Sequence, residues 1–124
     1  MAIGLFRKRE GSEKILNKFA ERTGSKTYED IFGSWGFRDY NQLSGRIISA
    51  LEASTKIRVN LDLIVKDTDN LLEKLLSVME KGSKGLSRDN ITNWEIYQIL
   101  KNPSRRSKAV FYLNGKAIKI PDGI

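Results

Sequence analysis

The chain has 124 residues, 40% of them apolar, and a net charge of +7, which are the proportions of one small globular domain with a strongly ionic surface. It contains no cysteine and no histidine, which excludes disulfides, thiolate chemistry, Ser-His catalytic arrangements and the usual zinc ligand. No run approaches the roughly 20 apolar residues that cross a bilayer, so we expect a cytoplasmic binding protein rather than an enzyme, without cofactor or metal.

Helical patterns dominate the first 54 residues. An apolar stripe at helical spacing covers residues 12–22, and a glycine follows it, as at a helix end. Thr27 can start a short second helix. Asp39 and Gln42 have the spacing of a capping box, in which each side chain bonds an unpaired backbone amide, and we expect a third helix from them to about residue 54.

The periodicity changes at residue 56. Apolar and polar side chains alternate from residue 57 until Ile64 breaks the pattern, which predicts a half-buried strand within residues 57–65. The apolar positions are Ile57, Val59, Leu61 and Leu63, and the polar ones are Lys56, Arg58, Asn60 and Asp62. An alternative stays open, because apolar residues between 43 and 78 also follow a 4-3 spacing that suits one long coiled-coil helix. The polar cluster at 67–70 favours a turn and a new helix instead.

Two further helices are predicted after the strand. Asn70 and Glu73 form another capping-box pair ahead of an apolar pattern that Gly82 closes. Either Ser87 or Thr92 can cap the next helix, which ends ahead of the proline at position 103.

The tail is predicted to be a basic hairpin. Asn114 and Gly115 are a strong hairpin signal, so we expect two strands within residues 109–120; a helix over 104–113 is the alternative. The last 26 residues carry a net charge of +5 and the first 28 carry +4, whereas the residues between them carry −2. Such clustering suits a polyanion such as nucleic acid, and a solvated basic surface is the other interpretation.

Between residues 56 and 101 the predicted order is therefore strand, helix, glycine turn and helix. This segment, about a third of the chain, resembles the ribbon-helix-helix DNA-binding family of the Arc and MetJ type. The matching stretches are the alternating KIRVNLDL, the helix NLLEKLLSVMEKG, the turn GLSRDNI and the second-helix residues EIYQIL.

The resemblance implies a homodimer in which the strands of two chains pair into a ribbon that enters the DNA major groove. Lys56, Arg58 and Asn60 would then face base edges, where arginine pairs with guanine and asparagine with adenine. Ser87 and Arg88, with the backbone amides at the start of the second helix, would hold a phosphate.

A winged helix is the alternative, because helix, strand, two helices and hairpin follow one another between residues 39 and 120. In that arrangement the helix over residues 93–101 enters the major groove and the hairpin is the wing. The tail's cations would grip phosphates, namely Arg105, Arg106, Lys108, Lys116 and Lys119.

The sequence thus predicts a mainly helical α+β fold with an N-terminal helical segment (1–54), a strand-helix-helix DNA-binding module (55–102) and a basic hairpin extension (103–124). The predicted function is a dimeric, non-enzymatic regulator of transcription or replication that binds double-stranded DNA. A helical scaffold or virion-type assembly protein with a heptad seam at 43–78 is the alternative. A further interpretation stacks nucleobases on the aromatic cluster Trp35, Phe37 and Tyr40.

Overall fold

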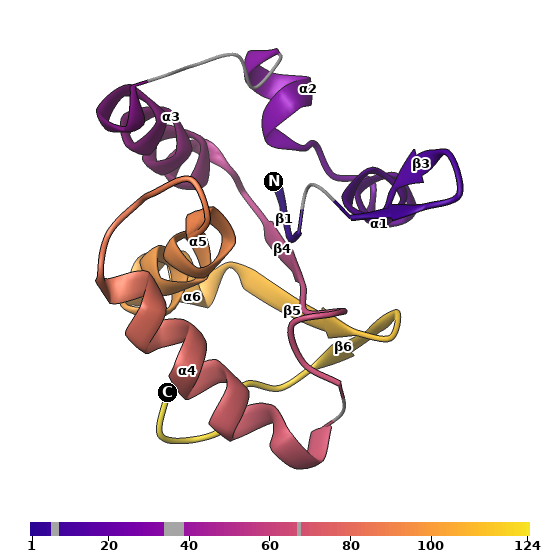
Figure 1. Cartoon of the computed structure of the whole chain (residues 1–124), viewed down its shortest axis with the longest axis vertical. Helices are drawn as coiled ribbons and strands as arrows, with labels where there is room; N and C mark the ends of the chain where they lie inside the picture. The colour runs from indigo at the N-terminus through magenta and orange to yellow at the C-terminus, as the bar shows by residue number, and fades with distance from the viewer. Residues whose placement is uncertain (6–7, 34–38, 67) are drawn as a thin grey trace.

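The computed structural model describes residues 1–5, 8–33, 39–66 and 68–124, which form an α+β fold of helices around a small sheet (Figure 1). The strands are β1 (Ala2–Ile3), β2 (Arg9–Glu10), β3 (Glu13–Lys14), β4 (Ile57–Asn60), β5 (Ala109–Leu113) and β6 (Lys116–Ile118). The α-helices are α1 (Ile15–Thr23), α2 (Tyr28–Phe32), α3 (Tyr40–Ala53), α4 (Leu71–Ser83), α5 (Ile91–Leu100) and α6 (Pro103–Ser107). None of the helices described is long and apolar enough to span a membrane.

The main sheet joins both ends of the chain to its middle. Its strand order is β1-β4-β5-β6, with β4 parallel to both β1 and β5, and β6 antiparallel to β5. The predicted hairpin is confirmed, and Asn114 and Gly115 form its turn with φ values of 53° and 79°. Two positive φ values in succession give the turn a twist that matches the strands on either side. The three segments distinguished in the sequence therefore share one sheet.

Helices cover both faces of this sheet. On one face, α3, α4 and α5 pack against Ile57, Val59 and Leu61, none of which is exposed. On the other face, the Phe19 ring of α1 meets the Tyr112 ring of β5, with centroids 5.3 Å apart. Figure 1 shows α1 and α5 on opposite sides of β1 and β4. The polar side of β4 therefore faces α1.

The strand at Ile57 is confirmed, but it is shorter than the alternation predicts. It ends at Asn60, and the chain then turns, with Leu63 in the left-handed region at φ 71°. The continuous helix of the heptad alternative is wrong, because the extended β4 separates α3 from α4. The extended form is stabilised because β1 and β5 pair with the two edges of β4. The 4-3 spacing of this segment does not reveal these strand partners.

Side-chain caps explain only some of the helix starts. Thr27 and Asp30 form the reciprocal capping box ahead of α2, and Asp39 caps α3 by accepting from two backbone amides. Asn70 precedes α4 without a side-chain bond to its amides. Neither predicted residue caps α5, because that helix begins after Asn90, whose side-chain amide ties the preceding turn to the end of α4.

Helix α5 is the buried centre of the fold. Eight of its ten residues are buried, and it packs against α4, α6, α3 and β1. The winged-helix alternative places this helix in the DNA major groove, and its burial corrects that prediction. Pro103, expected to end the helical region, instead begins α6, where proline lacks an amide that would be unpaired in any case.

Candidate nucleic-acid interface

β4 lies inside the sheet, so it cannot form the intermolecular ribbon that the sequence predicts. β1 pairs with one of its edges and β5 with the other, both in parallel. A ribbon between two chains requires a free edge on this strand. The paired edges therefore correct the expected dimer contact through β4.

The three residues predicted to read bases lie in different environments. Lys56 is exposed ahead of β4. Asn60 is only 4% exposed, and its side-chain oxygen accepts a hydrogen bond of 3.0 Å from the backbone amide of Asp62. Arg58 is half-buried and donates to the Tyr112 hydroxyl at 2.6 Å. Asn60 therefore stabilises the turn after β4, and Arg58 faces α1.

Arg58 reaches a cavity of about 310 Å³ between α1 and the main sheet, which we call the arginine cavity. Its lining residues are Phe19, Arg22, Thr23, Arg58, Tyr112 and Gly115. None of these is a carboxylate, and among the described residues neither Arg22 nor Arg58 forms an ion pair. Two guanidinium charges that face one space repel each other, so the cavity favours an anion.

Local sequence explains how these side chains meet. Arg22 lies three residues after Phe19, so both share one face of α1. Phe19 is 2% exposed, and its ring meets that of Tyr112 edge to face, at an interplanar angle of 73°. Tyr112 alternates along β5 with the buried Phe111 and Leu113, so it projects from the opposite face of the sheet, toward α1.

The amino terminus of the chain lies near Arg58. The ammonium group of Met1 donates to the carbonyl oxygen of Lys56 at 2.9 Å. Burial lowers the pKa of this ammonium group, and the charges of Arg58 and Lys108 lower it further. The charges of Arg58 and Lys108 therefore make the potential at this amino group positive.

A second hollow of about 390 Å³ shares Arg22 with the arginine cavity, and we call the two together the basic groove. The charged residues that line the second hollow are Glu10, Lys18, Arg22, Asp62 and Lys66. Its two carboxylates have partners within the chain. Glu10 lies 3.8 Å from Lys18, and Asp62 accepts a bond of 2.7 Å from the backbone amide of Asn114. The amide that bonds Asp62 is neutral, so Asp62 keeps its negative charge, and the three cations and two carboxylates together leave the hollow with a net charge of +1.

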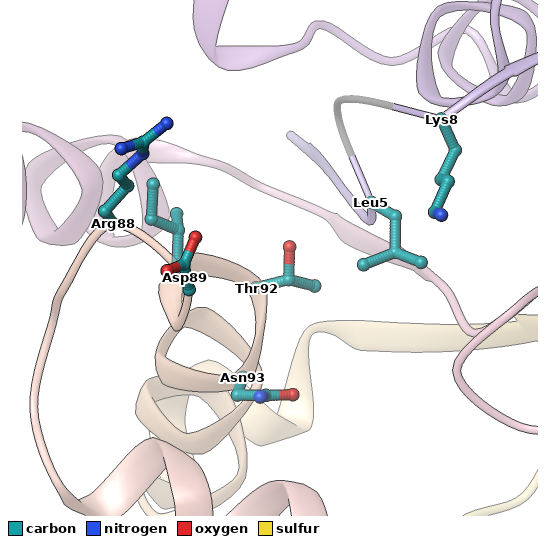
Figure 2. A pocket seen from close by; sticks show the side chains of 7 residues that line it. Leu5, Lys8, Arg88, Asp89, Thr92 and Asn93 are labelled. Carbon is teal, nitrogen blue, oxygen red and sulfur yellow. The ribbon is translucent and has the colours of Figure 1, made fainter.

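The phosphate site predicted at Ser87 and Arg88 corresponds to a third pocket, of about 240 Å³, at the start of α5 (Figure 2). Ser87 is exposed, and Arg88 forms part of the lining. Figure 2 shows Arg88 and Lys8 at opposite ends of this pocket, with Thr92 between them. The Thr92 hydroxyl donates to a backbone carbonyl at 3.1 Å, and Asp89 places a negative charge in the same lining. This pocket is therefore a weaker anion site than the arginine cavity.

Arg105 is a structural residue rather than the DNA-binding residue that the sequence predicts. It is 8% exposed. It donates to the Glu52 carboxylate at 2.8 and 3.1 Å and to the backbone carbonyl of Gln98 at 3.0 Å. This network ties α6 to α3 and α5, so the charge faces the interior of the protein.

The other cations of the tail differ in their surroundings. Arg106 donates to the carbonyl oxygen of Ile124 at 2.6 Å, and Lys108 donates to two carbonyls at the end of α3. Both therefore hold the fold together. Lys116 and Lys119 are exposed, and Lys116 follows the glycine that lines the arginine cavity.

Arg22 and Tyr112 belong to the groove but were not predicted as site residues. The alternation of Tyr112 with the apolar Phe111 and Leu113 along the predicted strand is the signal that could have found it. The sequence does not show which helix covers that face of the sheet, so no sequence pattern could have identified Arg22 as a site residue.

Of the aromatic cluster considered for base stacking, Trp35 and Phe37 lie outside the described residues, and Tyr40 begins α3.

Comparisons of this chain with protein-family models, with curated proteins and with solved structures found no match. The candidate interface therefore depends on its own geometry and charge.

Proposed function

We propose that this protein binds nucleic acid without catalysing a reaction, and that double-stranded DNA places its phosphates against Arg22 and Arg58 in the basic groove. The observation that carries the proposal is the convergence of these two arginines, from α1 and β4, on one cavity whose described lining has no carboxylate. A phosphate supplies the negative charge that this lining lacks. Guanidinium groups bind phosphate oxygens through paired, charge-assisted hydrogen bonds, which are among the stronger polar contacts in proteins.

Lysines extend the positive surface beyond the arginine cavity. Lys66 lines the second hollow, and Lys116 lies at the hairpin turn. A duplex presents one phosphate charge for about every 1.7 Å of its axis, so several of these cations can be neutralised at once. Affinity in this proposal therefore comes mainly from the DNA backbone.

Base reading by the polar side of β4 has no part in the proposal. The side-chain oxygen of Asn60 accepts a hydrogen bond from the backbone amide of Asp62 in the turn after β4, and both edges of the strand are paired. Backbone contacts position a protein on DNA but carry no sequence information directly. A regulator of transcription or replication that binds in this way should bind different DNA sequences with similar affinity.

The test is the salt dependence of binding to a fluorescently labelled duplex, measured by anisotropy. Contacts to about four phosphates give a slope of about −3.6 in a plot of log affinity against log salt concentration. Affinity should then fall roughly 100-fold between about 50 and about 200 mM salt. The proposal is wrong if the protein does not bind at the lower salt concentration, or binds with no salt dependence. Sedimentation of the same samples measures the oligomeric state.

Two triple variants form a matched control, because each removes three exposed positive charges. The groove variant changes Arg22, Lys66 and Lys116 to Gln, and the α4 variant changes Lys74, Lys81 and Lys84 to Gln. We expect the groove variant to flatten the salt slope by about 2.7 and the α4 variant to bind nearly as the unmodified protein does. Equal losses in both variants would indicate attraction to the whole positive protein and would contradict a defined groove.

A further inference from the structure

The arginine cavity has room for more than a single phosphate group. Its volume of about 310 Å³ lies within the usual range for small-molecule sites. It is bounded by α1 on one side and by β4, β5 and the hairpin turn on the other. A space of this size can admit the terminal group of a ligand as well as a phosphate of a continuous strand.

The two arginines match the charge of a phosphomonoester. A phosphodiester in a nucleic-acid backbone carries one negative charge, whereas a terminal phosphate carries nearly two at neutral pH. Arg22 and Arg58 supply two positive charges, and no lining residue among those described offsets them. The terminal group therefore balances the cavity's charge, and an internal phosphate balances only half of it.

Arg58 is held in place before any ligand arrives. Its guanidinium donates to the Tyr112 hydroxyl at 2.6 Å, and the Tyr112 ring is held edge to face by Phe19. One Arg58 nitrogen is engaged in this way, and the planar guanidinium has further N–H groups to offer. Pre-organisation of this kind raises affinity, because less side-chain freedom is lost on binding.

We propose that the arginine cavity is a receptor for a phosphomonoester, provided by the 5′-phosphorylated end of a nucleic-acid strand or by a free mononucleotide. The first source rests on the proposed function, since it requires nucleic acid in the basic groove. In both sources Arg22 and Arg58 bind the phosphate oxygens, and Tyr112 positions Arg58.

The experiment compares two blunt duplexes of one sequence, one with 5′-phosphates and one with 5′-hydroxyls, together with adenosine monophosphate and adenosine as free probes. We expect the phosphorylated duplex to bind about tenfold more tightly, since charge-assisted hydrogen bonds of this kind are worth about one decade or more in affinity. If the ligand is instead a free mononucleotide, we expect the protein to bind adenosine monophosphate but not adenosine, and to bind the two duplexes with equal affinity.

Variants separate the cavity from general attraction to added charge. Arg58→Gln should abolish the preference for the phosphorylated probe, whereas Lys116→Gln should weaken both duplexes equally and keep the preference. Tyr112→Phe should reduce the preference without removing it, because it releases Arg58 but leaves its charge. If Arg58→Gln fails to fold, Arg22→Gln provides the same test, because Arg22 is exposed.

The outcomes for the two proposals are distinct. Equal affinity for both duplexes, together with no binding of adenosine monophosphate, overturns the phosphomonoester receptor while leaving DNA binding intact. Failure of both duplexes to bind at low salt contradicts the proposed function. Binding of adenosine monophosphate then tests by itself whether the arginine cavity is a phosphomonoester receptor. A phosphate preference that persists in both the Arg58→Gln and the Arg22→Gln variants also overturns the inference.

Discussion

Two helical glycines in this chain should respond in opposite directions to the same substitution. Gly82 is buried in α4, where that helix packs on α5, whereas Gly45 is exposed in α3. A methyl group at position 82 would lie 2.5 Å from the Cβ of Tyr97 and closer still to the backbone oxygen of Asn93. A methyl group at position 45 meets nothing within 4 Å.

The magnitudes follow from these surroundings. Carbon atoms pack at about 3.5–4.0 Å, so Gly82→Ala must push α4 away from α5 by roughly 1 Å. The obstructing atoms belong to the backbone and to a Cβ, which no rotamer change can move, so we expect a packing cost of about 3 kcal/mol. Alanine's better helix propensity returns about 1 kcal/mol, which leaves Gly82→Ala destabilised by about 2 kcal/mol. Gly45→Ala receives the propensity gain alone.

Thermal and urea denaturation followed by circular dichroism measure both effects. For a chain of this length 1 kcal/mol corresponds to about 4 °C in Tm, so we expect Gly82→Ala to lower Tm by about 8 °C and Gly45→Ala to raise it by about 4 °C. An unchanged urea m-value would show that the unfolding transition is the same in each variant. If Gly82→Ala proves as stable as Gly45→Ala, the close packing of α4 on α5 is wrong.

Three further predictions concern buried polar groups. Burial raises the pKa of Glu95 from 4.5 to about 8, so the folded protein retains a proton that the unfolded chain loses, and stability falls as pH rises between these values. Denaturation of the unmodified protein and of Glu95→Gln should show their stability difference changing by roughly 1 kcal/mol per pH unit from about pH 5 to about pH 8; a constant difference would refute the assignment. Arg105→Ala should lower the free energy of unfolding by about 3 kcal/mol, because it leaves the acceptors on Gln98 and Glu52 without their donor. Glu52→Gln, at a half-exposed position, should lower it by about 1 kcal/mol. Equal losses of stability in urea denaturation would contradict the burial of Arg105. Asn60→Ala should lose about 1 kcal/mol of stability and leave the salt slope of DNA binding unchanged, and a changed slope would restore Asn60 as a DNA contact.

The elements of the fold were largely predictable because they follow from local patterns. The reciprocal side chains of Thr27 and Asp30 specify the start of α2, and the Asn114-Gly115 pair specifies the hairpin turn, since each depends on residues a few positions apart. The α6 helix escaped prediction because Pro103 was taken as the end of one helix, while Asn102 makes it the beginning of the next by accepting from a backbone amide at 3.0 Å.

The candidate site was less predictable, because its residues come from distant parts of the chain. Arg58 was identified, but the cavity that it lines with Arg22 and Tyr112 depends on α1 covering the polar face of the sheet. Arg105 was predicted to bind DNA from its charge alone. Its burial against Glu52 depends on how α3 and α6 pack, which charge counting along the tail does not reveal.

The sequence by itself predicted most of the helices, favoured an extended segment near residue 57 with its apolar side inward, and determined that positive charge gathers toward both ends. Those properties depend on propensity and periodicity, which act over a few neighbouring residues. Only the tertiary structure decided that β4 lies between β1 and β5, that α5 is buried, and that Arg22 and Arg58 line one cavity. Strand order and helix coverage are set by contacts between residues far apart in the chain, where the burial of one face against another outweighs any local preference.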